Sequence, residues 1–173
     1  MNQRLRNTFG LALTITTLFI SYATALPAQA QAALTRGDVV ALANTDRAQS
    51  GVAGNLAEDA RLDAAAQAVA NDMAAKGYFS HVAPGGTTPW YWLKRAGYYY
   101  WSAGQNLAVN FDDAQSLNSA WMNSPTHRAN IVNAGYSRIG IGIAHGTYHG
   151  KPATFIVEYF ANPYLGSSKV AVR

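Results

Sequence analysis

The residues best suited to chemistry gather directly around Pro125. Within the seven residues from Ser124 to Asn130, the chain carries a hydroxyl, an imidazole, a guanidinium and an amide. Ser124 and His127 are three residues apart, so they could act as a nucleophile and its base. A serine hydrolase also needs an orienting acid and an oxyanion hole, and the sequence identifies neither. No complete catalytic constellation is evident, and the other interpretation is that Ser124 caps the turn after Pro125.

A second imidazole, His81, lies between the end of a predicted helix at Gly77 and the loop formed by Pro84, Gly85 and Gly86. Two neutral imidazoles are good zinc ligands, but a structural zinc site has four ligands and a catalytic one usually has three and a water. If His81 and His127 lie together, these two imidazoles alone could hold a divalent metal such as zinc only weakly.

Glu158 is a carboxylate inside an apolar run, residues 155–160. An isolated charge there would be costly unless it is paired. One hypothesis makes Glu158 the carboxylate of the site formed by the histidines. The alternative is a salt bridge to Arg47, Arg128 or Arg138.

Four helices and a hairpin are expected to position these side chains. The helices are predicted from Arg36 to about Ala48, from about Glu58 to Lys76, from Pro89 to Gly97, and from Asp112 or Asp113 to the break at Ser124. Isoleucines alternate with small residues over 139–144, and residues 154–160 form a nearly unbroken apolar run. These patterns predict two antiparallel strands, of which the second is central.

This element order predicts an α+β layered domain. The strand glycines and the alanine-rich face of the second helix indicate close approach of neighbouring elements. His145 and His149 flank the predicted hairpin turn; they could share a metal, but solvated histidines on an exposed turn are the more ordinary expectation.

Residues 1–30 read as a signal peptide, with Arg4 and Arg6 before an apolar run and a small-residue cleavage site at 28–30. An uncleaved membrane anchor is the alternative, which Pro27 argues against. Removing this leader takes two basic and no acidic residues, so the formal charge falls from +4 to +2. The basic residues are scattered, so the sequence does not indicate nucleic-acid binding. Without cysteine there is no disulfide framework, and once the leader is removed no membrane span is expected in the mature form.

Several motifs in order resemble the CAP superfamily, which includes the cysteine-rich secretory, antigen 5 and pathogenesis-related proteins, and they match best its cysteine-free bacterial, SCP-like branch. The motifs are Asn44-Thr45-Asp46-Arg47, Phe79-Ser80-His81, Ala96-Gly97-Tyr98, Gly104-Gln105-Asn106-Leu107, the run from Trp121 to Ile131, and Ile139-Gly140-Ile141-Gly142. The expected organisation is a CAP domain over residues 31–163 and a short tail over 164–173.

The resemblance implies an α-β-α sandwich with a mainly antiparallel sheet between helical layers, and a cleft where two histidines and two glutamates hold a metal in many members. His81 and His127 match the histidines. Gln105 and Ser124 stand where carboxylates are common. A glutamine amide brings no charge, so both metal binding and acid/base chemistry are weakened.

The sequence therefore predicts a secreted or periplasmic binding module rather than an enzyme. Its cleft would take a small ligand, lipid, peptide or weakly held metal, and its predicted lining is His81, Gln105, Asn106, His127, Asn130 and Glu158. Two alternatives stay open: a hydrolase that is metal-assisted or uses His127, and a module that contacts cell-wall glycan or protein through the aromatic run 98–101.

Overall fold

The structure is a computed structural model that describes residues 34–164. Its helices are α1 (Arg36–Gln49), α2 (Ala60–Lys76), α3 (Pro89–Arg95), α4 (Ala114–Asn123) and α5 (Pro125–Ile131). Its strands are β1 (Ala57–Glu58), β2 (Tyr100–Val109), β3 (Arg138–Tyr148) and β4 (Lys151–Pro163). The predicted signal peptide and nearly all of the predicted tail lie outside the described residues.

The four strands form one sheet in the order β1-β3-β4-β2. β4 is antiparallel to both of its neighbours, and the short β1 runs parallel to β3. The predicted hairpin and the central place of the second strand are thus confirmed. The sheet is mixed only through the two residues of β1.

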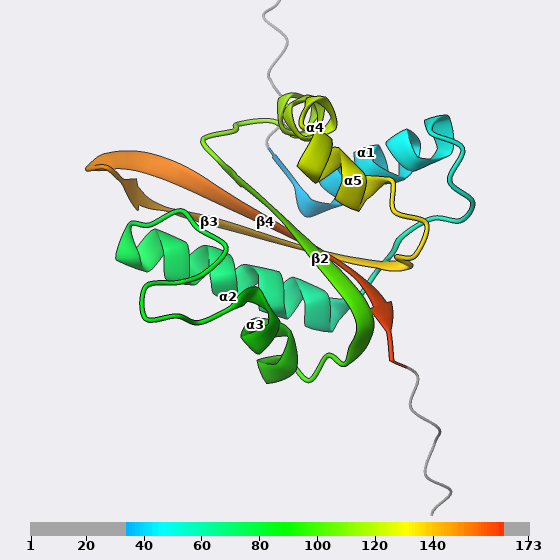
Figure 1. Cartoon of the computed structure of the whole chain (residues 1–173). Coiled ribbons are helices and arrows are strands. Elements are labelled where there is room, and N and C mark those ends of the chain that lie inside the picture. Colours follow the sequence, from blue (N-terminus) through cyan, green and yellow to red (C-terminus); the bar gives the residue numbers. More distant parts are fainter. Residues whose placement is uncertain (1–33, 165–173) are drawn as a thin grey trace, which may run out of the picture. The chain divides into compact units, whose positions relative to one another are not determined.

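Helices cover both faces of the sheet, α2 and α3 on one and α1, α4 and α5 on the other (Figure 1). Each face has its own buried apolar cluster, and residues of β4 enter both: Phe155 and Val157 the first, Ile156 and Phe160 the second. This confirms the α+β class and the α-β-α sandwich.

Local signals at the helix ends agree with the sequence. The Asp59 carboxylate accepts a hydrogen bond from the backbone N–H of Arg61 at 2.9 Å and caps α2, which ends where Gly77 turns left-handed at φ 68°. The alanines of α2 lie directly on the glycines of β3. A Cβ on Gly140 or Gly142 would collide with the backbone of α2 at Leu62 or Ala66.

Besides the two-residue strand β1, two elements differ from the expectation. Residues 100–109 form the edge strand β2, a segment not predicted to be extended. Pro125 does end α4, but it also begins α5, so the cluster around His127 lies on a short helix rather than in a loop. Proline fits this place because the first residue of a helix needs no N–H donor.

Candidate functional site

The candidate site lies along the edge strand β2, where the two helical layers meet its central residues. Gln105 pairs with Tyr159 across the β2–β4 ladder, and Asn106 pairs with Glu158. Because successive side chains of a strand point to opposite faces, Gln105 lies on the α2 and α3 face, and Asn106 on the α4 and α5 face. The site therefore has two halves, one on each side of the sheet.

His81 occupies the first half. It follows α2, is exposed, and its Nδ1 lies 2.8 Å from Oε1 of the buried Gln105. An amide oxygen only accepts, so His81 Nδ1 carries the proton and donates it to Gln105. His81 Nε2 then keeps its lone pair, which makes it the atom available as a base or as a metal ligand.

His127 occupies the second half. It lies on α5, half-buried, and its ring centroid is 6.4 Å from that of Trp121. Burial lowers the pKa of His127, and the nearby His81 lowers it further because two positive imidazoles repel. At neutral pH the His127 imidazole is uncharged. The effect of His81 on the His127 pKa indicates that the two predicted histidines lie near each other.

Asn106 links α5 to the sheet. It is fully buried, and its Nδ2 donates to the backbone oxygen of His127 at 3.2 Å and to Glu158 Oε2 at 2.9 Å. Its Oδ1 accepts from Asn130 Nδ2 at 2.8 Å. Asn106 and Asn130 therefore position the His127 helix.

Side chains from α4 and α5 also cover the outer edge of β2. Asn130 Nδ2 donates to the backbone oxygen of Gln105 at 3.3 Å, and Trp121 Nε1 donates to that of Leu107 at 3.2 Å. An edge strand otherwise leaves such groups unpaired. Gly104 has no room for a side chain, since a Cβ there would lie 2.7 Å from Asn130 Oδ1. The sequence predicted Asn130 in the cleft lining, but it did not predict this contact, because residues 100–109 were not recognised as a strand.

Glu158 lies beneath Asn106 and is completely buried. Its Oε1 has no hydrogen-bond partner within residues 34–164. Burial raises the pKa of Glu158 to about 8, against the opposing effect of the Asn106 hydrogen bond, so it is protonated at neutral pH.

The salt bridge considered for Glu158 is not formed. Within residues 34–164 the ion pairs involve only Asp59 and Asp72. The Arg47 guanidinium donates instead to backbone oxygens, including those of Ile131 at 2.9 Å and Tyr136 at 3.1 Å.

The remaining candidates give no catalytic pair. Ser124 occupies the N-cap position of α5, but its side chain does not cap the helix. Its Oγ lies 3.3 Å from Thr126 Oγ1, and among residues 34–164 it forms no hydrogen bond with an imidazole. His145 Nδ1 lies 3.1 Å from Thr154 Oγ1 in the exposed hairpin. Among residues 34–164, no three His, Cys, Asp or Glu side chains form a group that could hold a metal ion.

The fold and the motifs agree with a match to the model of the cysteine-rich secretory protein family, CAP, over residues 40–160. This chain belongs to the CAP family. Among curated relatives, YkwD of Bacillus subtilis, an uncharacterized protein, is 38% identical over 104 residues, which are 60% of this chain and 40% of YkwD. The B. subtilis membrane protein YlbC is 31% identical over 44% of this chain and 22% of its own length. The CAP chain thus spans less than half of either relative.

Solved structures show the same CAP fold. An extracellular protein containing a SCP domain, from Bacillus anthracis, matches with a TM-score of 0.60 and 27% identity over 73% of this chain and 39% of its own. An outer surface protein of Borrelia burgdorferi matches with a TM-score of 0.63 and 20% identity over 75% of this chain and 96% of its own. None of the helices in residues 34–164 is long and apolar enough to cross a membrane.

Proposed function

We propose that this CAP protein is a secreted, non-catalytic binding module whose ligand site lies between His81 and His127 at the edge of β2. The observation that carries the proposal is the contact between His81 Nδ1 and Gln105 Oε1 at 2.8 Å. It fixes the ring with its Nε2 lone pair available, yet gives it no negative partner. A ring held in this way can bind but has no carboxylate to raise its basicity.

The extracellular location rests on two supports. One is the leader-like composition of residues 1–30, which we propose are cleaved, leaving a CAP domain over 31–163 and a tail over 164–173. The other is the description of a relative, the B. anthracis protein, as extracellular.

The donor atoms limit the ligand. His81 and His127 supply two imidazole nitrogen ligands, and Gln105 Oε1 is engaged by His81. These residues fit a divalent cation such as zinc held weakly, with water completing its coordination. The same residues could equally form hydrogen bonds with a polar group of a peptide, of a lipid headgroup or of another small ligand. Gln105 Nε2 is buried and without a partner among the described residues, so it adds an unused donor next to His81.

The hydrolase alternative has less support. His127 is neutral and could accept a proton, but neither imidazole contacts a carboxylate, and the Ser124 hydroxyl is directed to Thr126. The buried Glu158 contacts Asn106 and holds its own proton, so it cannot orient an imidazole as the acid of a triad does.

Zinc calorimetry on the purified protein tests the metal form of the proposal. Binding heat is expected for the parent and for His145→Ala, a control at a histidine outside the site, and is expected to be lost in His81→Ala and His127→Ala. Gln105→Glu should tighten binding by about tenfold because it places a negative charge beside His81.

Equal heats in the parent and in all three alanine variants would contradict the site. Heat in none of them would exclude zinc. A screen of peptides and lipids by imidazole NMR would then look for a ligand that shifts the ring signals of His81 and His127 together while leaving those of His145 in place.

A further inference from the structure

Exposed aromatic side chains gather on a region of the molecule that shares no residue with the histidine site. Among residues 34–164, six large apolar side chains are exposed, and all except Val82 are tyrosine or tryptophan. The five exposed aromatic residues are Trp90, Tyr91, Tyr99, Trp101 and Tyr164. A clustered patch of this kind on a protein surface commonly marks an interaction site.

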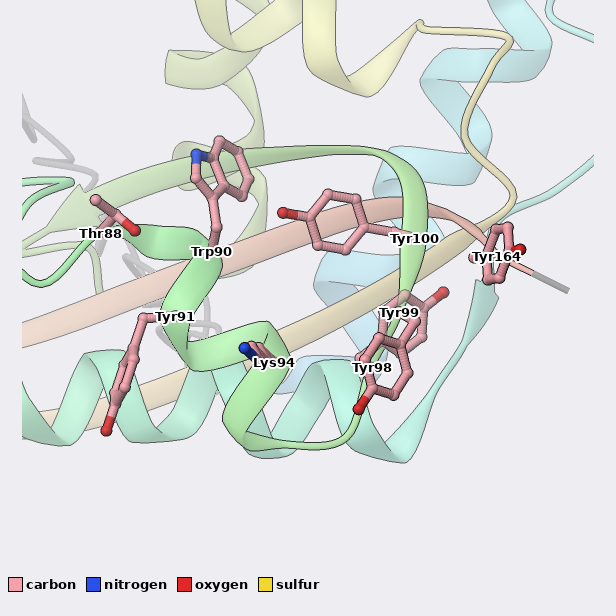
Figure 2. A pocket seen from close by; sticks show the side chains of 8 residues that line it. All are labelled: Thr88, Trp90, Tyr91, Lys94, Tyr98, Tyr99, Tyr100 and Tyr164. Atoms are coloured by element: carbon pink, nitrogen blue, oxygen red, sulfur yellow. The ribbon is translucent and has the colours of Figure 1, made fainter. Parts of the chain in front are cut away.

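Four of these side chains, all except Trp101, border a groove of about 440 Å³, which we call the aromatic groove. Its lining consists of Thr88, Lys94 and six aromatic side chains, which come from α3, from residues 98–100 and from Tyr164. Figure 2 shows Trp90 and Tyr100 turned toward each other, with Lys94 on the same helix as Trp90. The volume is within the range of ligand sites, about 300–1,000 Å³.

A β-bulge at Trp101 and the contacts of Tyr164 shape one end of the groove. The register between β2 and β4 shifts between Tyr100 and Ser102, so Trp101 is the extra residue of a bulge. Such a bulge redirects side chains at a sheet edge. The Tyr164 N–H donates to the Tyr99 backbone oxygen at 3.0 Å, and the Tyr164 ring packs edge-on against Trp101 with centroids 4.7 Å apart. Contacts within the protein thus hold Tyr164 at the end of the groove.

Lys94 gives the groove a positive charge. Among residues 34–164 no carboxylate lines the groove, and the two ion pairs, Arg61–Asp59 and Lys76–Asp72, do not involve Lys94. Lys94 is exposed, and the neighbouring Arg95 donates to the Tyr91 hydroxyl at 3.4 Å. A ligand that complements this lining needs apolar faces, hydroxyls and a negative group.

We propose that the aromatic groove binds an acidic glycan, with sugar rings packed on Trp90, Tyr99 and Tyr164 and a sugar carboxylate on Lys94. A pyranose ring has C–H groups on its faces and hydroxyls around its rim. Aromatic faces attract C–H groups through their negative π density, and the tyrosine hydroxyls can hydrogen-bond the sugar hydroxyls around the rim. The Lys94 ammonium adds selection for an acidic sugar.

Two other occupants fit less well. Insertion into a membrane needs aliphatic side chains beside the aromatic ones, and in the described part of the chain no leucine, isoleucine, methionine or phenylalanine is among the exposed large side chains. A proline-rich peptide suits an aromatic groove, but it would leave the Lys94 charge without a partner.

Binding of a short oligogalacturonate to the purified protein tests this inference, with its fully methyl-esterified form as the uncharged counterpart. Lys94→Gln is expected to weaken binding by about fivefold and to remove the preference for the acid over the ester. Tyr99→Ala should weaken binding of both forms by about fivefold or more, and Tyr99→Phe should retain it, since the ring provides the contact. Lys151→Gln, at an exposed lysine of the hairpin, is the matched charge control.

Unchanged thermal unfolding of the Tyr99 and Lys94 variants keeps the comparison interpretable, because both side chains are exposed. The inference is overturned if the parent does not bind oligogalacturonate, or if Lys151→Gln weakens binding as much as Lys94→Gln. Tighter binding of oligoproline or of phosphatidylglycerol vesicles, lost in Tyr99→Ala, would also overturn it in favour of a peptide or a membrane. The histidine variants should bind the glycan normally, which separates this site from the one between His81 and His127.

Discussion

The buried carboxyl of Glu158 should make the stability of the protein fall as the pH rises. Glu158 is completely buried, its Oε2 accepts one hydrogen bond from Asn106, and its Oε1 has no partner among the described residues. Burial raises its pKa from an ordinary 4.5 to about 8. Between these two pH values the folded state holds a proton that the unfolded state has lost.

The sign and the size follow from proton linkage. Where the folded state binds the extra proton, the free energy of unfolding decreases with pH by about 1.4 kcal/mol per pH unit. Over the interval from 4.5 to about 8 this amounts to roughly 5 kcal/mol from one residue. The contribution is complete below the lower value, falls throughout the interval, and stays lost above the upper one.

Glu158→Gln removes the titrating group while keeping its shape and the acceptor for Asn106. Urea unfolding followed by tryptophan fluorescence should give a variant close to the parent near pH 5 and more stable than the parent by a few kcal/mol near pH 8. Glu58→Gln is the control, because the Glu58 side chain is exposed on β1. It should leave the pH dependence of the parent unchanged.

Two results would refute this reasoning. One is a pH dependence that persists in Glu158→Gln with the parent slope, which would assign the titration to another group. The other is a loss of about 3 kcal/mol or more at both pH values, which is typical of breaking a buried, ionised and bonded carboxylate. The second result would mean that Glu158 is charged in the folded protein.

Three further predictions concern contacts of the site and the packing of α2 against β3. Gln105→Glu should raise the pKa of His81, which imidazole NMR would show as a titration midpoint at higher pH. An unchanged midpoint would mean that the contact at 2.8 Å does not form. Asn130→Ala leaves two acceptors of β2 without their donor and should cost about 1–3 kcal/mol in urea unfolding, whereas a cost near zero would show that water replaces the amide. Gly142→Ala, whose Cβ would meet the backbone of α2, should lower the free energy of unfolding by several kcal/mol or prevent folding. Its control, Gly37→Ala in the open first turn of α1, should be neutral or stabilising, and equal effects of the two substitutions would contradict the close packing.

The sequence predicts those elements whose signals are local. Thr35 and Gly77 mark helix ends because their side chain or backbone conformation acts within one turn. The hairpin is also predictable from the sequence, since the small residues Gly140 and Gly142 alternate with isoleucines that must be buried. The alanines of α2 and these glycines predict one close interface, and the structure places them against each other.

β2 was missed because its pattern depends on distant partners. Gln105 and Asn106 are polar on opposite faces, so the strand shows no apolar alternation at its centre. They are buried only because His81, Glu158 and Asn130 supply their hydrogen bonds from elsewhere in the chain. Nor does the sequence show that Trp121 covers the outer edge of this strand, since that bond exists only once β2 is in place.

The position of Glu158 also bears on the proposal that the site binds a ligand rather than catalyses a reaction. Glu158 pairs across the sheet with Asn106, one residue beyond Gln105, and neighbouring residues of a strand face opposite sides. Its carboxyl therefore lies on the α5 face, whereas His81 contacts the sheet through Gln105 on the other face. A carboxylate displaced by one residue cannot replace the charge that Gln105 lacks, and its raised pKa keeps it protonated in any case. Among residues 34–164 no carboxylate bonds to either imidazole, and the Glu158 carboxyl can position the His127 helix through Asn106 but cannot activate either ring.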